Sequence, residues 1–271
     1  MKHLEESVRS RRSVRTYDPR SLTAQDREAL CAYMEHIENP YGLPVTFQLL
    51  EGMSSPVVVG TDLFVAGKMK KNAHMNEAFG YSFEKLVLYA ESMGIGTVWI
   101  GGTMDRGAFE KAMEVSADEV MPCVSPLGYP ATKMSLRETM MRKAVKAGER
   151  LPFEQIVFCG DLETPMTEEK AGALQLPLEM VRLAPSAINK QPWRMVVCDD
   201  MIHFYIKRAK GFGSGAIDMQ KIDMGIALCH FDMMARDLGL NPVFVIDEPQ
   251  IAGKGDMEYI ASYRWDEPAA R

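Results

Sequence analysis

Apolar residues recur with helical spacing in two stretches of the chain that resemble each other. Steps of three and four residues separate them, which places them along one side of a helix. These residues are Phe79, Phe83, Leu86, Ala90 and Met93 in the first stretch, and Met219, Ile222, Ile226, Cys229 and Met233 in the second. Further apolar residues occupy almost all other sides. The pattern therefore predicts two buried, central helices, from about residue 75 to 93 and from about 219 to 238.

The two helical stretches belong to a longer repeat, since residues 76–102 align with residues 221–247 without a gap. Gly94 and Gly239 coincide in this alignment, and each follows the last apolar helical position. Glycine ends a helix well because it enters the left-handed conformation at little cost. An apolar run follows each glycine, and we expect it to form a strand. Two unrelated buried helices would not share these features, so we infer an internal repeat.

Earlier segments of the chain correspond at nearly the same spacing. The corresponding segments are 21–42 with 165–187, and 43–52 with 191–200. In each half they read as a capped helix, a loop and a short strand, with Thr23 and Thr167 as the expected N-caps. We therefore expect two similar halves, residues 1–160 and 161–271.

Each half also has one segment without a counterpart in the other. The first half has RSRRSVRTYDP at residues 9–19, where the second half has the acidic CGDLETP. The second half has LAPSAINKQPW at residues 183–193, where the first has the shorter NPYGLP. If each half contributed different residues to one site, each would keep a segment that the other lacks. We therefore expect both halves to form a single site.

Composition and charge exclude several classes of protein. The 271 residues are 46% apolar and 25% charged, which is a normal globular balance. No apolar run reaches the roughly 18 residues of a membrane span, and the charged N-terminus is not followed by the apolar segment expected of a signal peptide. The net charge of −6 argues against nucleic acid and anionic membranes as partners. We therefore expect a cytoplasmic protein that acts on small molecules.

The chain carries no motif for metal binding or for nucleophilic catalysis. The five histidines and five cysteines include no H-E-x-x-H and no C-x-x-C spacing, so we expect no bound metal. A G-x-S-x-G motif is also absent. We expect no catalytic side chain, and any redox chemistry must come from an organic cofactor.

The basic segment RRSVR offers guanidinium groups to an anion. In an extended stretch alternate residues share a face, so Arg11, Ser13 and Arg15 could reach one anion together. Guanidinium forks suit phosphate oxygens, and each such charge-assisted bond is worth roughly 1.5–3 kcal/mol. The alternative is a basic arm that only contacts water.

This segment, followed by a proline and then S-L-T, resembles the opening signature of the nitroreductase family of flavoproteins. In that family the opening basic segment lies on the phosphate and the pyrimidine edge of FMN. The resemblance therefore implies that FMN is bound by Arg11, Arg12, Ser13 and Arg15.

The segment APSAINKQPWR at residues 184–194 is similar to the family's A-P-S-x-x-N-x-Q-P-W loop. In homodimeric members this loop reaches the flavin that the other subunit mainly binds. The resemblance therefore implies further FMN contacts from Pro185, Ser186, Ala187 and Asn189. Read from the residues alone, prolines stiffen a loop that offers hydrogen-bonding side chains. The alternative reading is a rigid surface turn anchored in the core by Trp193.

Two more segments follow the family's order. GIGTVWIGG, residues 94–102, resembles the family segment beneath the isoalloxazine ring, near its pyrimidine side and N5. The residues implied there are Trp99, Ile100, Gly101 and Gly102. Some members carry an acid where Gly101 stands, which leaves open what donates a hydrogen bond to N5. Arg150 matches the late arginine that closes on the phosphate.

The stretch at residues 210–219, KGFGSGAIDM, is rich in glycine, as are many loops that bind phosphate before a helix. Its G-x-G-x-G spacing is neither a dinucleotide-binding motif nor a P-loop. We interpret it as a flexible loop.

The resemblance implies an α+β nitroreductase fold, in which helices flank an antiparallel sheet and two protomers interleave. Here both protomers would be fused into a single-chain pseudo-dimer, with or without further homodimerisation. The implied function is FMN-dependent transfer of hydride from NAD(P)H, through flavin N5, to a nitroaromatic, a quinone or a similar acceptor. The alternative function is a flavin-binding carrier, sensor or scaffold with little turnover.

Overall fold

The computed structural model describes residues 3–210 and 215–265. The chain forms two compact units, Met1–Gly148 and Glu149–Arg271, here called the N-terminal and C-terminal units. The glycine-rich stretch interpreted as a flexible loop falls partly on residues 211–214, which lie outside the described residues.

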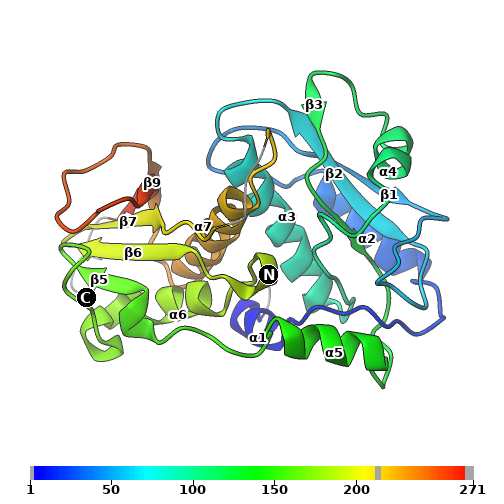
Figure 1. Cartoon of the computed structure of the whole chain (residues 1–271), viewed down its shortest axis with the longest axis horizontal. Helices are drawn as coiled ribbons and strands as arrows, with labels where there is room; N and C mark the ends of the chain where they lie inside the picture. Colours follow the sequence, from blue (N-terminus) through cyan, green and yellow to red (C-terminus); the bar gives the residue numbers. More distant parts are fainter. Residues whose placement is uncertain (1–2, 211–214, 266–271) are drawn as a thin grey trace. The chain divides into compact units, whose positions relative to one another are not determined.

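The N-terminal unit is a helical layer packed on a small antiparallel sheet (Figure 1). Strand β2 pairs antiparallel with β1, β3 and β4. Helix α3 packs on β2, and α2 packs on α3 and β1. The elements are α1 (Leu4–Ser10), α2 (Ala24–Met34), β1 (Thr46–Leu50), β2 (Phe64–Lys70), α3 (Met75–Ser92), α4 (Arg106–Ala112), β3 (Glu119–Val120), β4 (Val124–Pro126) and α5 (Leu136–Ala144).

The C-terminal unit has a sheet in the order β5-β6-β7-β9-β8, in which only β5 and β6 run parallel. Helix α7 packs on β6 and β7, with α6 against α7 (Figure 1). The elements are η1 (Phe153–Gln155), β5 (Val157–Cys159), η2 (Glu168–Leu174), α6 (Gln175–Leu183), η3 (Ala187–Asn189), β6 (Trp193–Cys198), β7 (Met201–Ile206), α7 (Met219–Asp237), β8 (Val243–Val245) and β9 (Glu258–Arg264).

In each unit, helices pack on a sheet whose strands are all or mostly antiparallel. This confirms the α+β class expected from the sequence. Helices α3 and α7 coincide with the two predicted helical stretches and are buried on nearly all sides. Strands β1 and β6 lie where short strands were expected.

Helices α3 and α7 end in the same hydrogen-bond pattern. Gly94 and Gly239 have φ of 72° and 79° and lie in the left-handed region. The N–H of the residue after each glycine donates to the carbonyl of Ala90 or Ala235, at 2.9 Å in both helices. These bonds satisfy carbonyls that a helix end leaves unpaired. The predicted glycine caps are confirmed, and matched positions of the repeat carry the same local structure.

Two local expectations were wrong. The run after Gly94 forms isolated bridges in place of a regular strand: Gly96 and Ile100 bridge to Gly128 and Val124 in the segment 124–128, and Thr97 bridges to Ser13. Thr23 caps α2 by accepting the Asp26 N–H at 3.1 Å, but the side chain of Thr167 caps nothing. Helix η2 begins there with a tight turn that the carbonyl of Thr167 closes, by accepting the N–H of Lys170 at 3.2 Å.

Candidate functional site

The basic segment after α1 is extended and is held by neighbours on both sides. The Val14 N–H donates to the carbonyl of Thr97 at 2.9 Å, while Tyr17 donates to Val59 at 2.8 Å. Tyr17 also donates its hydroxyl to the carbonyl of Val14 at 2.7 Å. The segment is therefore a fixed part of the N-terminal unit, and an extended backbone directs successive side chains to opposite faces.

Two glycines allow this close packing. A Cβ atom on Gly96 would lie 2.9 Å from the side chain of Val14, and one on Gly60 would lie 2.2 Å from the carbonyl oxygen of Tyr17. Gly60 also has φ of +96°, which L side chains rarely adopt. The glycines thus bring residues 14–17 against the segments around positions 60 and 96.

Arg12 and Thr16 share one buried carboxylate. Glu138 of α5, only 1% exposed, accepts from Arg12 Nη1 at 3.3 Å and from Thr16 Oγ1 at 2.8 Å. The N–H of Ser135 donates to Thr16 Oγ1 at 3.1 Å, while the Oγ of Ser135 caps the helix by accepting the Glu138 N–H. Arg12 therefore helps to fix the basic segment on α5.

Arg11 and Arg15 are in a different situation. Arg11 Nη1 and Arg15 Nε are buried, and within the described part of the chain no group accepts a hydrogen bond from them. Burial lowers the pKa of both guanidinium groups; Glu84 and Glu91 oppose this effect at Arg11, and Glu138 opposes it at Arg15. Buried donors without acceptors are costly, so these two groups suit an anion that the chain itself does not provide.

The segment from Trp99 to Gly102 has mixed roles. The indole N–H of Trp99 donates to Glu84 Oε2 at 3.0 Å, and its ring packs on Phe83 with centroids 4.6 Å apart. Ile100 is buried in the core of the unit and exchanges backbone bonds with Val124 at 2.9 Å.

The neighbouring glycines face different surroundings. The carbonyl of Gly101 accepts from Arg106 Nη2 at 2.9 Å. A Cβ atom on Gly102 would meet nothing within 4 Å, and Gly102 is not among the residues with positive φ. Neither backbone conformation nor packing requires glycine at 102, and the space beside it is open.

In the C-terminal unit, the loop before β6 has an unusual backbone. Ile188, Asn189 and Gln191 have φ of 43°, 59° and 49°, in the left-handed region. For a β-branched residue such as Ile188 this conformation is a strong outlier, and its side chain is 56% exposed. Strain of this kind costs roughly 1–3 kcal/mol per residue and is concentrated at functional sites.

Side-chain hydrogen bonds hold the loop in this conformation. Ser186 Oγ accepts the N–H of Gln191 at 2.8 Å, and Gln191 Oε1 accepts the N–H of Leu151 at 2.8 Å. Asn189 Nδ2 donates to the carbonyl of Glu149 at 3.0 Å, and its Oδ1 accepts from Arg150 Nη1 at 3.4 Å. Arg150 also donates to the carbonyl of Leu183 at 3.1 Å. The structure therefore brings Arg150 to the loop, as well as Ser186 and Asn189.

A buried carboxyl group lies behind this loop. Asp223 of α7 is 2% exposed and accepts the N–H of Ala187 at 2.9 and 3.1 Å. Burial raises its pKa well above the ordinary range; the Ala187 hydrogen bond opposes the shift, and the Asp218 carboxylate adds to it. Trp193 is fully buried, as the alternative reading of this loop expected for a core anchor.

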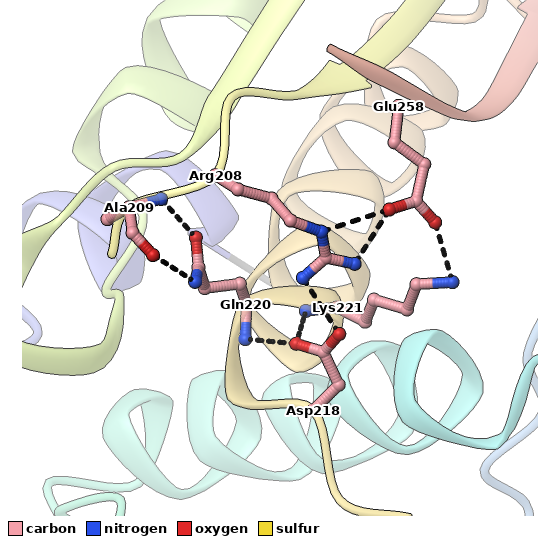
Figure 2. Close-up of polar contacts among 6 residues, drawn as sticks. All are labelled: Arg208, Ala209, Asp218, Gln220, Lys221 and Glu258. Carbon is pink, nitrogen blue, oxygen red and sulfur yellow. Dashed lines mark hydrogen bonds and ion pairs between the residues drawn. The ribbon is translucent and has the colours of Figure 1, made fainter. Parts of the chain in front are cut away.

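A second polar cluster in the C-terminal unit joins the segment after β7 to the start of α7 and to β9 (Figure 2). Arg208 contacts Asp218 at 2.9 Å and Glu258 at 2.7 Å, and Lys221 contacts Glu258 at 2.8 Å. Gln220 exchanges two hydrogen bonds with the backbone of Ala209, at 2.7 and 3.0 Å. Two cations face two carboxylates, so the cluster fixes the start of α7 and leaves little attraction for an added ion.

The predicted residues thus form two groups, one in each unit. The N-terminal group joins residues 11–15 to the segment 97–102 through the Ser13–Thr97 bridge. The C-terminal group joins Arg150 to residues 185–189. The sequence reasoning missed Glu138 and Asp223. The S-x-x-E pattern from Ser135 to Glu138 marks a helix start, and an acid within an apolar helix is a signal at Asp223.

Within residues 3–210 and 215–265, no three His, Cys, Asp or Glu side chains are grouped to hold a metal ion. In the same ranges, no helix has both the length and the apolar character that a membrane crossing needs.

Comparison with known proteins identifies similar chains. A family model described as "Putative TM nitroreductase" matches residues 3–235. The crystal structure of a "putative nitroreductase" from Thermotoga maritima covers 97% of this chain and 93% of its own, with a TM-score of 0.65 and 20% identity. This similarity confirms the predicted nitroreductase-like fold.

Other solved structures match about half of the chain. A nitroreductase with bound FMN from Bacteroides fragilis covers 50% of this chain and 92% of its own, with a TM-score of 0.42 and 19% identity. An FMN-dependent nitroreductase from Clostridium difficile covers 51% and 94%, with a TM-score of 0.41 and 15% identity. No curated protein matches the chain.

Proposed function

Because the chain belongs to the family described as "Putative TM nitroreductase", we propose that it is an FMN-dependent oxidoreductase. When bound, FMN supplies the redox chemistry, taking hydride at N5 from NADH or NADPH and reducing a nitroaromatic, a quinone or a similar small-molecule acceptor. The residues of the chain bind and orient the cofactor, and none of them needs to act as nucleophile or general base.

The buried, unpartnered donors of Arg11 and Arg15 carry this proposal. A phosphomonoester provides up to two negative charges and several acceptor oxygens, which match guanidinium donors in charge and geometry. The hydroxyl of Ser13 lies between them in the same extended segment. Arg12, engaged with Glu138, keeps the segment in place and offers its remaining donors.

The open space at Gly102 supports placement of a flat ring beside the segment 99–102. There the backbone can approach a ring closely, since no Cβ intervenes. Trp99 and Ile100 are fixed by Glu84 and Val124 and give this segment a rigid base.

We further propose that both units bind the same FMN, so that one chain acts as a pseudo-dimer with one cofactor. The strained, hydrogen-bonded loop at residues 185–189 supports a binding role for Pro185, Ser186, Ala187 and Asn189, with Arg150 held beside it. The cytoplasmic location stays a prediction, as does further homodimerisation.

Stopped-flow mixing of FMN-loaded protein with NADH or NADPH, without oxygen, tests the enzyme proposal. We expect loss of the flavin absorbance on mixing and its return when a quinone or nitroaromatic is added. Folded, FMN-loaded protein that neither nucleotide reduces would support the alternative of a flavin carrier or sensor.

The contribution of the C-terminal unit has its own test. Asn189→Ala should weaken FMN binding, measured by flavin fluorescence, because it removes the hydrogen bonds of this side chain with Arg150 and with the carbonyl of Glu149. Lys190→Ala, at the exposed neighbouring position, is the matched control. Equal FMN affinity of the two variants would remove this unit from the site.

A further inference from the structure

We infer that Arg142 of α5 is an additional ligand of the FMN phosphate, completing a group of three guanidinium groups with Arg11 and Arg15. Sequence motifs do not mark this residue, and the inference rests on the proposed FMN function. It adds one residue outside the basic segment to the expected ligands of the phosphate.

The first argument for Arg142 is the position of α5. Three hydrogen bonds fix its first turn to the basic segment, through Ser135, Thr16 and the Arg12–Glu138 pair. In Figure 1 the extended segment after α1 runs along α5. Arg142 lies four residues after Glu138, on the same side of the helix one turn later. The helix therefore directs Arg142 towards the segment that carries Arg11 and Arg15.

Electrostatics supports the same placement. The positive charge of Arg142 is close enough to lower the pKa of Arg11 and of Arg15, in addition to the larger effect of burial. Like charges that converge without an anion repel one another, so this arrangement suits a ligand of charge near −2.

The nearby carboxylates do not neutralise the three guanidinium groups by direct contact. Glu84 accepts the indole N–H of Trp99, Glu91 accepts the hydroxyl of Ser10, and Glu138 is bonded to Arg12 and Thr16. Among the described residues, none of these carboxylates accepts a hydrogen bond from the buried donors of Arg11 or Arg15. Arg142 is half-buried, and no ion pair is formed by it within the same part of the chain.

The test compares FMN with riboflavin, which has the same ring system and lacks the phosphate. Dissociation constants are measured by flavin fluorescence for the wild type, Arg142→Ala and the matched control Lys143→Ala. Lys143 is the exposed neighbour on the same helix and carries the same charge. We expect Arg142→Ala to weaken FMN binding about tenfold to hundredfold, the size of one charge-assisted bond.

Riboflavin binding should be unchanged in Arg142→Ala, and Lys143→Ala should bind both flavins like the wild type. Arg142→Lys should bind FMN with intermediate affinity, since it keeps the charge and loses the fork. Equal FMN affinity of Arg142→Ala and Lys143→Ala would overturn the inference, as would equal weakening of FMN and riboflavin. If the wild type binds no FMN, the proposed function itself fails.

Discussion

The arginines of one short segment have different surroundings, although their side chains are identical. Arg12 reaches a buried carboxylate on α5, whereas buried donors of Arg11 and Arg15 lack acceptors in the described chain. Leaving buried donors unpaired costs about 1–3 kcal/mol each or more. Arg12 thus helps to hold the basic segment in place. Arg11 and Arg15 are the groups that would gain most from hydrogen bonds to a bound anion.

Alanine substitutions at two glycines should separate folding from binding. Gly96→Ala should destabilise the protein by roughly 1–3 kcal/mol, because the added methyl group overlaps the side chain of Val14. Gly102→Ala should leave stability unchanged, since its methyl group enters open space, and should weaken FMN binding about tenfold. Urea denaturation and FMN titration measure the two effects. A Gly102→Ala variant with unchanged FMN affinity would contradict the placement of the ring.

Asp223 should make stability depend on pH. Its carboxyl group has a pKa well above the ordinary range in the folded protein, mainly because of burial. The folded state therefore binds this proton more tightly than the unfolded state, and stability is lost as pH rises above about 4 towards the raised pKa. Each tenfold difference in proton affinity between the two states corresponds to about 1.4 kcal/mol of stability.

Asp223→Asn keeps an acceptor for the Ala187 N–H and removes the ionisation. The variant should match the wild type below about pH 4 and become increasingly more stable than it as pH rises. Denaturation midpoints at several pH values measure this difference. A constant difference between acid and neutral pH would show that Asp223 ionises in the folded protein as readily as an exposed carboxyl.

Residue-level features were predictable where one side chain or one backbone preference decides them. Gly94 and Gly239 could be predicted to cap helices because glycine alone enters the left-handed region cheaply. The left-handed conformation of Ile188 could not, because it depends on hydrogen bonds from residues distant in sequence, including Asp223. The Arg12–Glu138 pair spans 126 residues, and no local pattern announces it.

At the scale of elements, helices α3 and α7 end in equivalent motifs at matched positions of the repeat. Gly94→Ala and Gly239→Ala should each lower stability by about 1–2 kcal/mol, because alanine is strained in the left-handed region. Gly107→Ala is the control, since it lies within helix α4 and alanine should stabilise it by about 0.5–1 kcal/mol. Thermal or chemical denaturation measures all three. Loss of stability at only one of the two caps would argue that the motifs are not equivalent.

Long, periodic elements were predicted well, and short apolar runs were not. The spacing of apolar residues fixed α3 and α7 almost to their ends. The run at 96–100 has the composition of a strand, but it forms isolated bridges, with Thr97 paired to Ser13, and Gly96 and Ile100 paired to the segment 124–128. Pairing between distant segments decides such a stretch, and a single sequence does not encode it locally.

At the scale of the whole molecule, the chain is built from two units that carry different groups of candidate residues. The basic segment and the glycines at 101 and 102 belong to the N-terminal unit, and the loop with Arg150 belongs to the C-terminal unit. Because neither unit has both groups, we expect one complete set of FMN contacts per chain. The internal repeat alone would suggest two sites, so the cofactor stoichiometry distinguishes these possibilities.

The amount of FMN bound per chain tests this account most directly. After saturation with FMN and removal of the unbound excess, flavin absorbance is compared with protein concentration from amino-acid analysis. We expect one FMN per chain. A ratio near two would contradict the division of one site over two unequal halves, and a ratio near zero would contradict the proposed flavin function.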